Sequence, residues 1–167
     1  SFLAFLERPD RKRIVLAGAL FGIAQLLKFS LVLLIPIDLM LLAAWVITQP
    51  VLSWGERVRM TFTLLGKMLI AGLVALAVIW GTYGVLVKNY PQGRQLRDAE
   101  FLLSSYGFRP AVNLDLALIK NRITRPIGQY LLGVLMVQQR SAGGNTAFFL
   151  GEVSAAGSRL YFPRLYL

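Results

Sequence analysis

The chain alternates between long apolar runs and shorter polar stretches. Apolar residues fill most of residues 14–48 and 62–87, whereas residues 88–125 are mixed and polar. A straight helix over the first run would be about 50 Å long, well beyond the roughly 30 Å hydrocarbon core of a bilayer. We expect this run to break at its central polar interruption, Lys28-Phe29-Ser30. The pattern predicts transmembrane helices at about 14–28, 31–48 and 62–87.

Prolines, aromatic residues and glycines refine these three predicted helices. Pro36 lies in the first turns of the second helix and Pro50 follows its end, where a missing N–H costs little. Trp80 and Tyr83, toward the end of the third helix, are typical of an aromatic belt at the membrane interface. Three glycines of this helix offer places where another helix could approach closely, Gly66, Gly72 and Gly81.

The polar segment after residue 87 has helical periodicity of its own. Leu96, Ala99, Leu103 and Tyr106 predict a short helix over 94–106, closed by Gly107. Asn113 is a candidate N-cap of a second helix that ends near residue 122. A third helix should begin at Pro126 and end before Gly143-Gly144, with one apolar arc of Ile127, Tyr130, Leu131, Val134 and Leu135. At about 14 residues it is expected to lie along the membrane face. The carboxylates of this segment fit solvated helix faces, namely Asp98, Glu100 and Asp115.

The distribution of charge orients the predicted helices. The net charge is +10, with 18 Lys and Arg residues, which in a soluble protein would suggest nucleic acid. Here the cations cluster at residues 8–13, before the first helix, and at Arg57 and Arg59, before the third. The positive-inside rule places both clusters in the cytoplasm, with Lys28 near the opposite face and residues 88–158 outside the cytoplasm. The predicted partner is therefore the lipid bilayer, and no nucleic acid is expected.

Composition supports this architecture and restricts the chemistry. Hydrophobic residues make up 56% of the chain and charged residues only 16%, compared with about a quarter in soluble domains. The sequence predicts an all-α membrane protein, with multi-pass transmembrane helices in residues 1–87. An extracytoplasmic loop with short amphipathic helices follows in 88–158, and a further truncated transmembrane helix starts in 159–167. The chain contains no Cys and no His, so thiol nucleophiles, imidazole catalysis and the usual zinc ligands are excluded.

Two stretches resemble glycosyltransferases that use polyprenyl-phosphate sugars, the superfamily of protein O-mannosyltransferases and the lipid A aminoarabinose transferase (glycosyltransferase family 39-like). Residues 13–36, RIVLAGALFGIAQLLKFSLVLLIP, are similar to a helical hairpin of that family. Residues 126–133 (PIGQYLLG), 149–154 (FLGEVS) and 157–163 (GSRLYFP) resemble a loop of a bacterial branch, which leads into the next span. The chain differs from that branch at Ser158-Arg159-Leu160, where paired aromatics are common, and at Arg164.

This resemblance implies a GT-C membrane fold in a bacterial plasma (inner) membrane. It implies a polyprenyl-phosphate-sugar donor and an acceptor, which is a lipid, glycan or protein, on the extracytoplasmic side. The family's catalytic carboxylate lies on a loop after its first span, and this chain is expected to be a central-to-C-terminal fragment that lacks it. No metal and no cofactor other than the donor substrate are predicted.

Several residues are candidates for contacts with such substrates, each with a structural alternative. Lys28 would meet the donor phosphate near the membrane face, or would be an interfacial anchor whose ammonium reaches water. Arg159 and Tyr161 would reach the same phosphate, or anchor the next span. Tyr130 and Glu152 would contact the acceptor or order the loop. The structural alternative is that each serves in packing or helix capping.

Asp38 is the only carboxylate inside a predicted span, where an unpaired charge is costly. In the structural interpretation, Asp38 pairs with Lys28, with Lys67 or with a helix outside the chain. In the functional interpretation, its carboxylate takes part in chemistry. The alternative function is a non-catalytic membrane transport or scaffold protein, in which Lys28 and Asp38 form an ion pair or line a permeation route.

Overall fold

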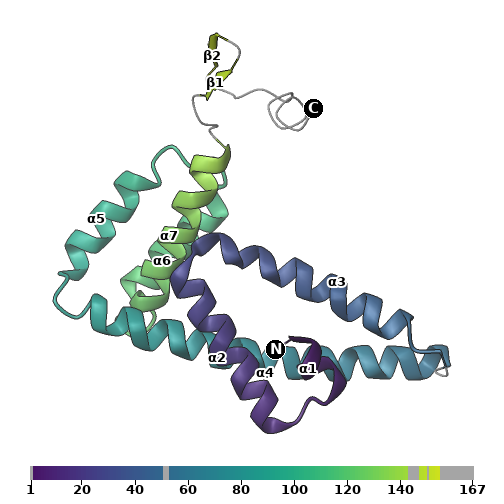
Figure 1. Ribbon diagram of the computed structural model, residues 1–167. Helices are drawn as coiled ribbons and strands as arrows, with labels where there is room; N and C mark the ends of the chain where they lie inside the picture. Colours follow the sequence, from purple (N-terminus) through teal and green to yellow (C-terminus); the bar gives the residue numbers. More distant parts are fainter. Residues whose placement is uncertain (1, 51–52, 143–146, 150, 155–167) are drawn as a thin grey trace.

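A computed structural model describes residues 2–50, 53–142, 147–149 and 151–154. Over these residues the chain is helical apart from one small hairpin (Figure 1). The helices are α1 (Phe2–Glu7), α2 (Arg11–Leu27), the 3-10 helix η1 (Phe29–Leu33), α3 (Leu34–Ile47), α4 (Trp54–Leu86), α5 (Gln92–Leu102), α6 (Arg109–Lys120) and α7 (Arg125–Ala142). The antiparallel strands β1 (Ala147–Phe149) and β2 (Glu152–Ser154) were not predicted. They flank Gly151, whose φ of 89° suits a glycine at a turn.

The predicted break at Lys28 is confirmed. α2 ends at Leu27, and Lys28 has an extended backbone (φ −156°, ψ 119°) before η1 begins. α4 begins at Trp54 rather than near residue 62, because Ser53 and Glu56 form a capping box that extends the helix beyond its apolar part.

Within the part of the chain that the structure describes, two helical segments are long and apolar enough to cross a membrane, Phe29–Ile47 and α4. Only 11% and 17% of their most apolar windows are buried within the protein, whereas the core helix of a soluble protein would be mostly buried. The first predicted span, residues 14–28, corresponds to α2, which has 17 residues, the first three of them basic. Its remaining apolar part is about 21 Å long, shorter than the hydrocarbon core.

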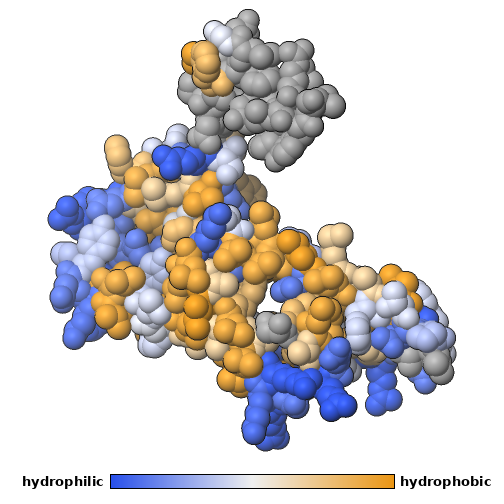
Figure 2. Space-filling model, in the orientation of Figure 1, coloured by the Kyte–Doolittle hydropathy of each residue, from blue (hydrophilic) through white to orange (hydrophobic). Residues whose placement is uncertain are grey.

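Apolar side chains on α2 and α3 remain exposed over a wide surface. Figure 2 shows apolar residues over these two helices, with hydrophilic surface at the start of α2 and over α5. The exposed side chains include Leu16, Leu20, Leu27, Ile37, Met40 and Ile47. An apolar surface of this extent is typical of a helix in contact with lipid or with another protein.

α2 crosses α4 at a contact made by two glycines one helical turn apart (Figure 1). A Cβ atom on Gly18 would lie 2.3 Å from the carbonyl oxygen of Ala71, and one on Gly22 would lie 2.9 Å from that of Ala75. The close approach therefore depends on Gly18 and Gly22 of α2. The prediction that Gly66, Gly72 and Gly81 offer such contacts is wrong for this structure, because a Cβ on any of them meets nothing within 4 Å.

α2 and α3 diverge from η1, and each packs against α4 instead of packing along the other (Figure 1). Near the far end of α3, the short helix α1 fills part of the space between them. Phe5 and Leu6 of α1 are buried in a core with Ile14, Leu42, Val46 and Leu64. Arg57 donates hydrogen bonds to the carbonyls of Val46, Ile47 and Gln49 and so caps the end of α3.

α5, α6 and α7 form a second core, around Ala99, Leu103, Val112, Ile119, Leu132 and Leu135. The predicted apolar face of 94–106 is confirmed, although α5 itself ends at Leu102, before Gly107. Asn113 is not an N-cap, because α6 begins four residues earlier at Arg109. The reason is Pro110, whose fixed φ suits the first turn of a helix. The predicted start of the third helix at Pro126 is confirmed within one residue.

Asp115 is buried rather than solvated, which corrects the prediction from sequence. Its side chain is 0% exposed, and neither carboxylate oxygen has a hydrogen-bond partner among the described residues. It lies on the buried face of α6 with Val112 and Ile119. Burial raises the pKa of Asp115 to about 7 from its ordinary value of 3.8.

The glycine contact predicts opposite effects for the same substitution at two positions. Gly18→Ala places a methyl group against the α4 backbone, so we expect the free energy of unfolding to fall by about 1–3 kcal/mol. Gly66→Ala adds its methyl in open space and improves helix propensity, so unfolding should become harder by about 0.5–1 kcal/mol. Unfolding in detergent, followed by circular dichroism, measures both. Equal effects of the two substitutions would contradict the close crossing of α2 and α4.

Asp115 predicts a pH-dependent stability. Its folded pKa lies above its unfolded pKa, so the folded state binds more protons between about pH 4 and pH 7, and stability falls as pH rises through this window. The full loss is on the order of 4 kcal/mol. Asp115→Asn removes this charge. The free energy of unfolding of this variant, minus that of the wild type, should therefore rise with pH and be larger at pH 8 than at pH 5. Glu100→Gln, at an exposed position on α5, is the control. A difference independent of pH would show that Asp115 is not isolated from water.

Candidate functional site

Lys28 occupies the turn between α2 and η1, and its side chain is exposed. The backbone around it is fixed by hydrogen bonds on both sides. The Lys28 N–H donates to the carbonyl of Ala24 at 3.1 Å, and the Leu31 N–H donates to the carbonyl of Lys28 at 3.0 Å. Within the described part of the chain, the Lys28 ammonium makes no hydrogen bond or ion pair. The turn therefore presents a free cation from a well-defined backbone.

Gln25 connects this turn to α7. It is 1% exposed, and its side-chain amide donates to the carbonyl of Leu31 at 2.9 Å, across the turn. Its side-chain oxygen accepts a hydrogen bond of 2.9 Å from the hydroxyl of Tyr130. A buried amide with both ends satisfied is held firmly, so the turn keeps a fixed position relative to α7.

Tyr130 is the centre of an aromatic cluster. Its ring centroid lies 5.8 Å from that of Phe29 in η1 and 6.0 Å from that of Tyr83 in α4. Burial, together with the neighbouring Tyr83, raises the pKa of Tyr130, so its hydroxyl stays protonated and able to donate. Phe29 in turn lies on Gly133, where a Cβ would come within 2.4 Å of the ring. The structure thus brings the predicted residues Lys28 and Tyr130 to the same junction, with the Tyr130 hydroxyl engaged by Gln25.

A groove of about 530 Å³ lies beside this junction, between η1, the end of α5 and α7. Its lining is mostly apolar and includes Phe29, Leu102, Met136 and Val137. Arg140, in the last turn of α7, adds the only charged side chain among the described residues of the lining. Lys28 directly precedes the wall residue Phe29 in the chain but is not itself among the residues that line the groove.

Sequence reasoning missed Arg140, although its signal was present. Met136 and Val137 lie four and three residues before it, so a helix places all three on one side. Arg140 is exposed and makes no hydrogen bond or ion pair with any residue that the structure describes. It was overlooked because the prediction concentrated on the arc from Ile127 to Leu135.

Side-chain contacts with backbone carbonyls hold α7 against α4. The Trp80 indole N–H donates to the carbonyl of Ile123 at 2.7 Å, just before α7. The Arg125 guanidinium donates to the carbonyls of Val87 and Tyr90 at 3.0 and 2.5 Å, at the end of α4. Trp80 was predicted as an interfacial aromatic, and here it also fixes the connection from α6 to α7. These contacts determine where the groove lies relative to the long helix.

The other predicted site residues are not brought to this groove by the described part of the structure. Glu152 begins β2, where its backbone is in register with Phe149. Arg159 and Tyr161 lie outside the described residues. Asp38 lines a separate space between α2, α3 and α4 and forms no ion pair with Lys28 or Lys67 within 4 Å, so the predicted pairing with either lysine is wrong.

The groove therefore combines one cation of its lining, Arg140, with apolar walls, and a second cation, Lys28, precedes the wall residue Phe29. A phosphate or another oxyanion would form charge-assisted hydrogen bonds with an ammonium or a guanidinium, whereas the apolar lining would accept hydrocarbon. Lys presents a point charge and Arg a planar fork, so the two side chains offer different contacts to the same anionic group. The ligand class that fits is an amphiphile with an anionic head.

Searches against protein families, curated proteins and solved structures identify no match to this chain, so the residues and their geometry alone support any functional assignment.

Proposed function

We propose that this chain is part of an integral membrane glycosyltransferase of a bacterial plasma membrane, which transfers a sugar from a polyprenyl-phosphate donor to an extracytoplasmic acceptor. The observation that carries this proposal is the exposed Lys28, which has no partner among the described residues, on a fixed turn just before an apolar groove that contains Arg140. The stretch that resembles the family, residues 13–36, also includes this turn, which supports the same assignment.

The chemistry assigned to this site is stabilisation of the leaving group. When the sugar leaves a polyprenyl phosphate, negative charge grows on the phosphate oxygens, and nearby cations lower the energy of that state. Lys28 and Arg140 would supply these cations, and the groove would hold the first isoprenoid units. Activation of the acceptor hydroxyl requires a general base, for which we propose a carboxylate outside this chain.

The alternative, a transport or scaffold protein, included a structural ion pair between Lys28 and Asp38. Within the described residues these two side chains are not paired. Lys28 is exposed beside the groove of η1 and α7, whereas Asp38 lines the space between α2, α3 and α4. Because each of these two charges lies near its own cavity or groove, a role in ligand binding fits them better than a purely structural role.

The membrane topology is testable by cysteine labelling, since the chain has no native Cys. Arg59, near the start of α4, and Glu100, on α5, are both exposed and suit single substitution to Cys. If α4 crosses the membrane, we expect an impermeant maleimide to label position 100 from outside the cell, and position 59 only after permeabilisation. Labelling of both positions from the same side would rule out a crossing by α4.

The donor contact predicts a loss of affinity when the cations are removed. Lys28→Met and Arg140→Met each keep an apolar stem but lose a charge-assisted contact worth roughly 1.5–3 kcal/mol, which corresponds to about ten- to a hundredfold in donor affinity or rate. The measurement is sugar transfer at varied donor concentration, by the intact membrane protein that contains this chain. Lys67→Met is the control, because Lys67 lines a different cavity, formed with α1 and the first turns of α4. Unchanged kinetics of Lys28→Met would make Lys28 an interfacial anchor and remove the main support for this function.

A further inference from the structure

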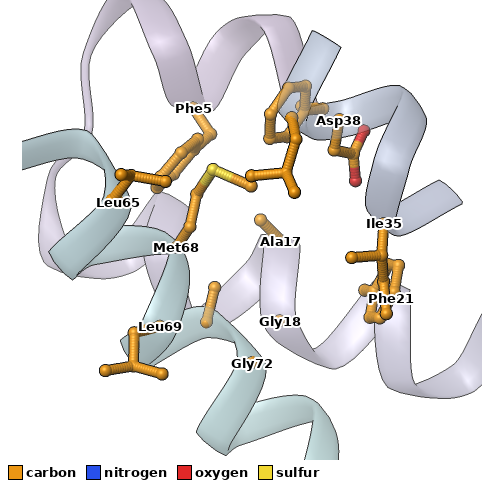
Figure 3. A pocket seen from close by; sticks show the side chains of 13 residues that line it. Phe5, Ala17, Gly18, Phe21, Ile35, Asp38, Leu65, Met68, Leu69 and Gly72 are labelled. Carbon is orange, nitrogen blue, oxygen red and sulfur yellow. The ribbon is translucent and has the colours of Figure 1, made fainter. Parts of the chain in front are cut away.

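A second cavity lies where α2 and α3 diverge. It has a volume of about 340 Å³, and its walls come from α1, α2, α3 and α4. In Figure 3, Phe5, Leu65 and Met68 lie on one side, and Phe21 and Ile35 lie on the other. These side chains are apolar, so most of the cavity suits hydrocarbon.

Among the described residues of the lining, Asp38 is the single charged one. It is half-buried, and its carboxylate lies on the α3 side of the cavity next to Ile35 (Figure 3). Among the described residues it has neither an ion pair nor a hydrogen bond. A carboxylate in apolar surroundings is costly unless a cation or a hydrogen-bond donor meets it. The described walls of the cavity therefore carry one negative charge, on Asp38, and no positive charge that would neutralise it.

The two lysines predicted as partners of Asp38 do not supply this cation. Lys28 is at the turn, separated from Asp38 by η1 and the first turn of α3. Lys67 lines a different cavity together with Glu56 and Arg59. The neighbouring residues of α4 that line the Asp38 cavity are all uncharged, namely Leu65, Met68, Leu69, Ala71 and Gly72.

We propose that this cavity binds a lipophilic ammonium ion, whose nitrogen pairs with Asp38 and whose hydrocarbon part lies between Phe5, Phe21 and Met68. The volume equals that of roughly eleven waters at about 30 Å³ each, so a single chain of about ten carbons with one amine fills it. This site is independent of the proposed donor site, because a phosphate would be repelled by Asp38.

The test uses two probes of the same shape, decylamine and decanol, each carrying a diazirine for photolabelling. The full chain in detergent is irradiated with each probe at pH 7, where the amine is charged, and the labelled residues are identified by mass spectrometry. We expect the amine to label the cavity residues at least tenfold more than the alcohol does. Asp38→Asn, which keeps the size of the side chain, should remove this preference, because both probes then meet a neutral amide.

A matched pair of variants tests whether the cavity itself holds the probe. Gly72 lines the cavity, and a Cβ there meets nothing within 4 Å, so Gly72→Leu should occupy the space and abolish labelling by both probes. Gly81→Leu, at an equally open glycine of the same helix that does not line the cavity, should leave labelling unchanged. Equal labelling by amine and alcohol, or a preference that survives in Asp38→Asn, would overturn the proposal. Labelling that survives in Gly72→Leu would do the same.

Discussion

The close contact of α2 with α4 controls the arrangement of the first four helices. Gly18 and Gly22 let the α2 backbone touch that of α4, and even one methyl group at Gly18 would be too large. α3 must follow α2 after a short turn, yet the last turns of α3 pack on α4. With α2 held at the crossing, α3 cannot also lie along it, and the two helices diverge. Both the α1 contact with the core and the cavity at Asp38 follow from this geometry.

A second constraint joins the apolar helices to the polar ones. The hydrogen bond from Tyr130 to Gln25 spans more than a hundred residues of sequence, and Gln25 also holds the turn through the carbonyl of Leu31. Such a buried polar link stabilises the fold only when every member has a hydrogen-bond partner, because an unsatisfied amide would destabilise the junction. Since Phe29 lies on Gly133 at the same place, the turn that carries Lys28 cannot move independently of α7. The position of the cation beside the groove is thus fixed by packing on three helices.

Local patterns in the sequence predicted much of this fold, and long-range packing accounts for most of the differences. The break at Lys28 and the start of α7 depend on run length and on proline, which act within a few residues. Close helix approach was predicted at glycines of α4, whereas Gly18 and Gly22 of α2 provide it, because sequence alone does not say which faces meet. Asp115 was assigned to solvent although Val112, Leu116 and Ile119 place it within an apolar stripe, and that spacing was sufficient to suggest burial. Helical spacing from Met136 and Val137 placed Arg140 beside apolar residues, but that a groove lies there became clear only from the packing of α7 and η1.

The positions of Lys28 and Asp38 show how a short stretch of chain can keep opposite charges apart. On one continuous helix, residues ten apart would lie about 15 Å apart along the axis. The extended backbone at Lys28 and the 3-10 turn after it also redirect the chain, so that the cation adjoins the groove of α7 and the carboxylate adjoins the space under α1. An ion pair between them would have neutralised both charges within apolar surroundings, where such pairs are stable only with good geometry. Because the fold prevents that pairing, each charge remains available, and the two spaces differ in the sign of the ligand that they favour.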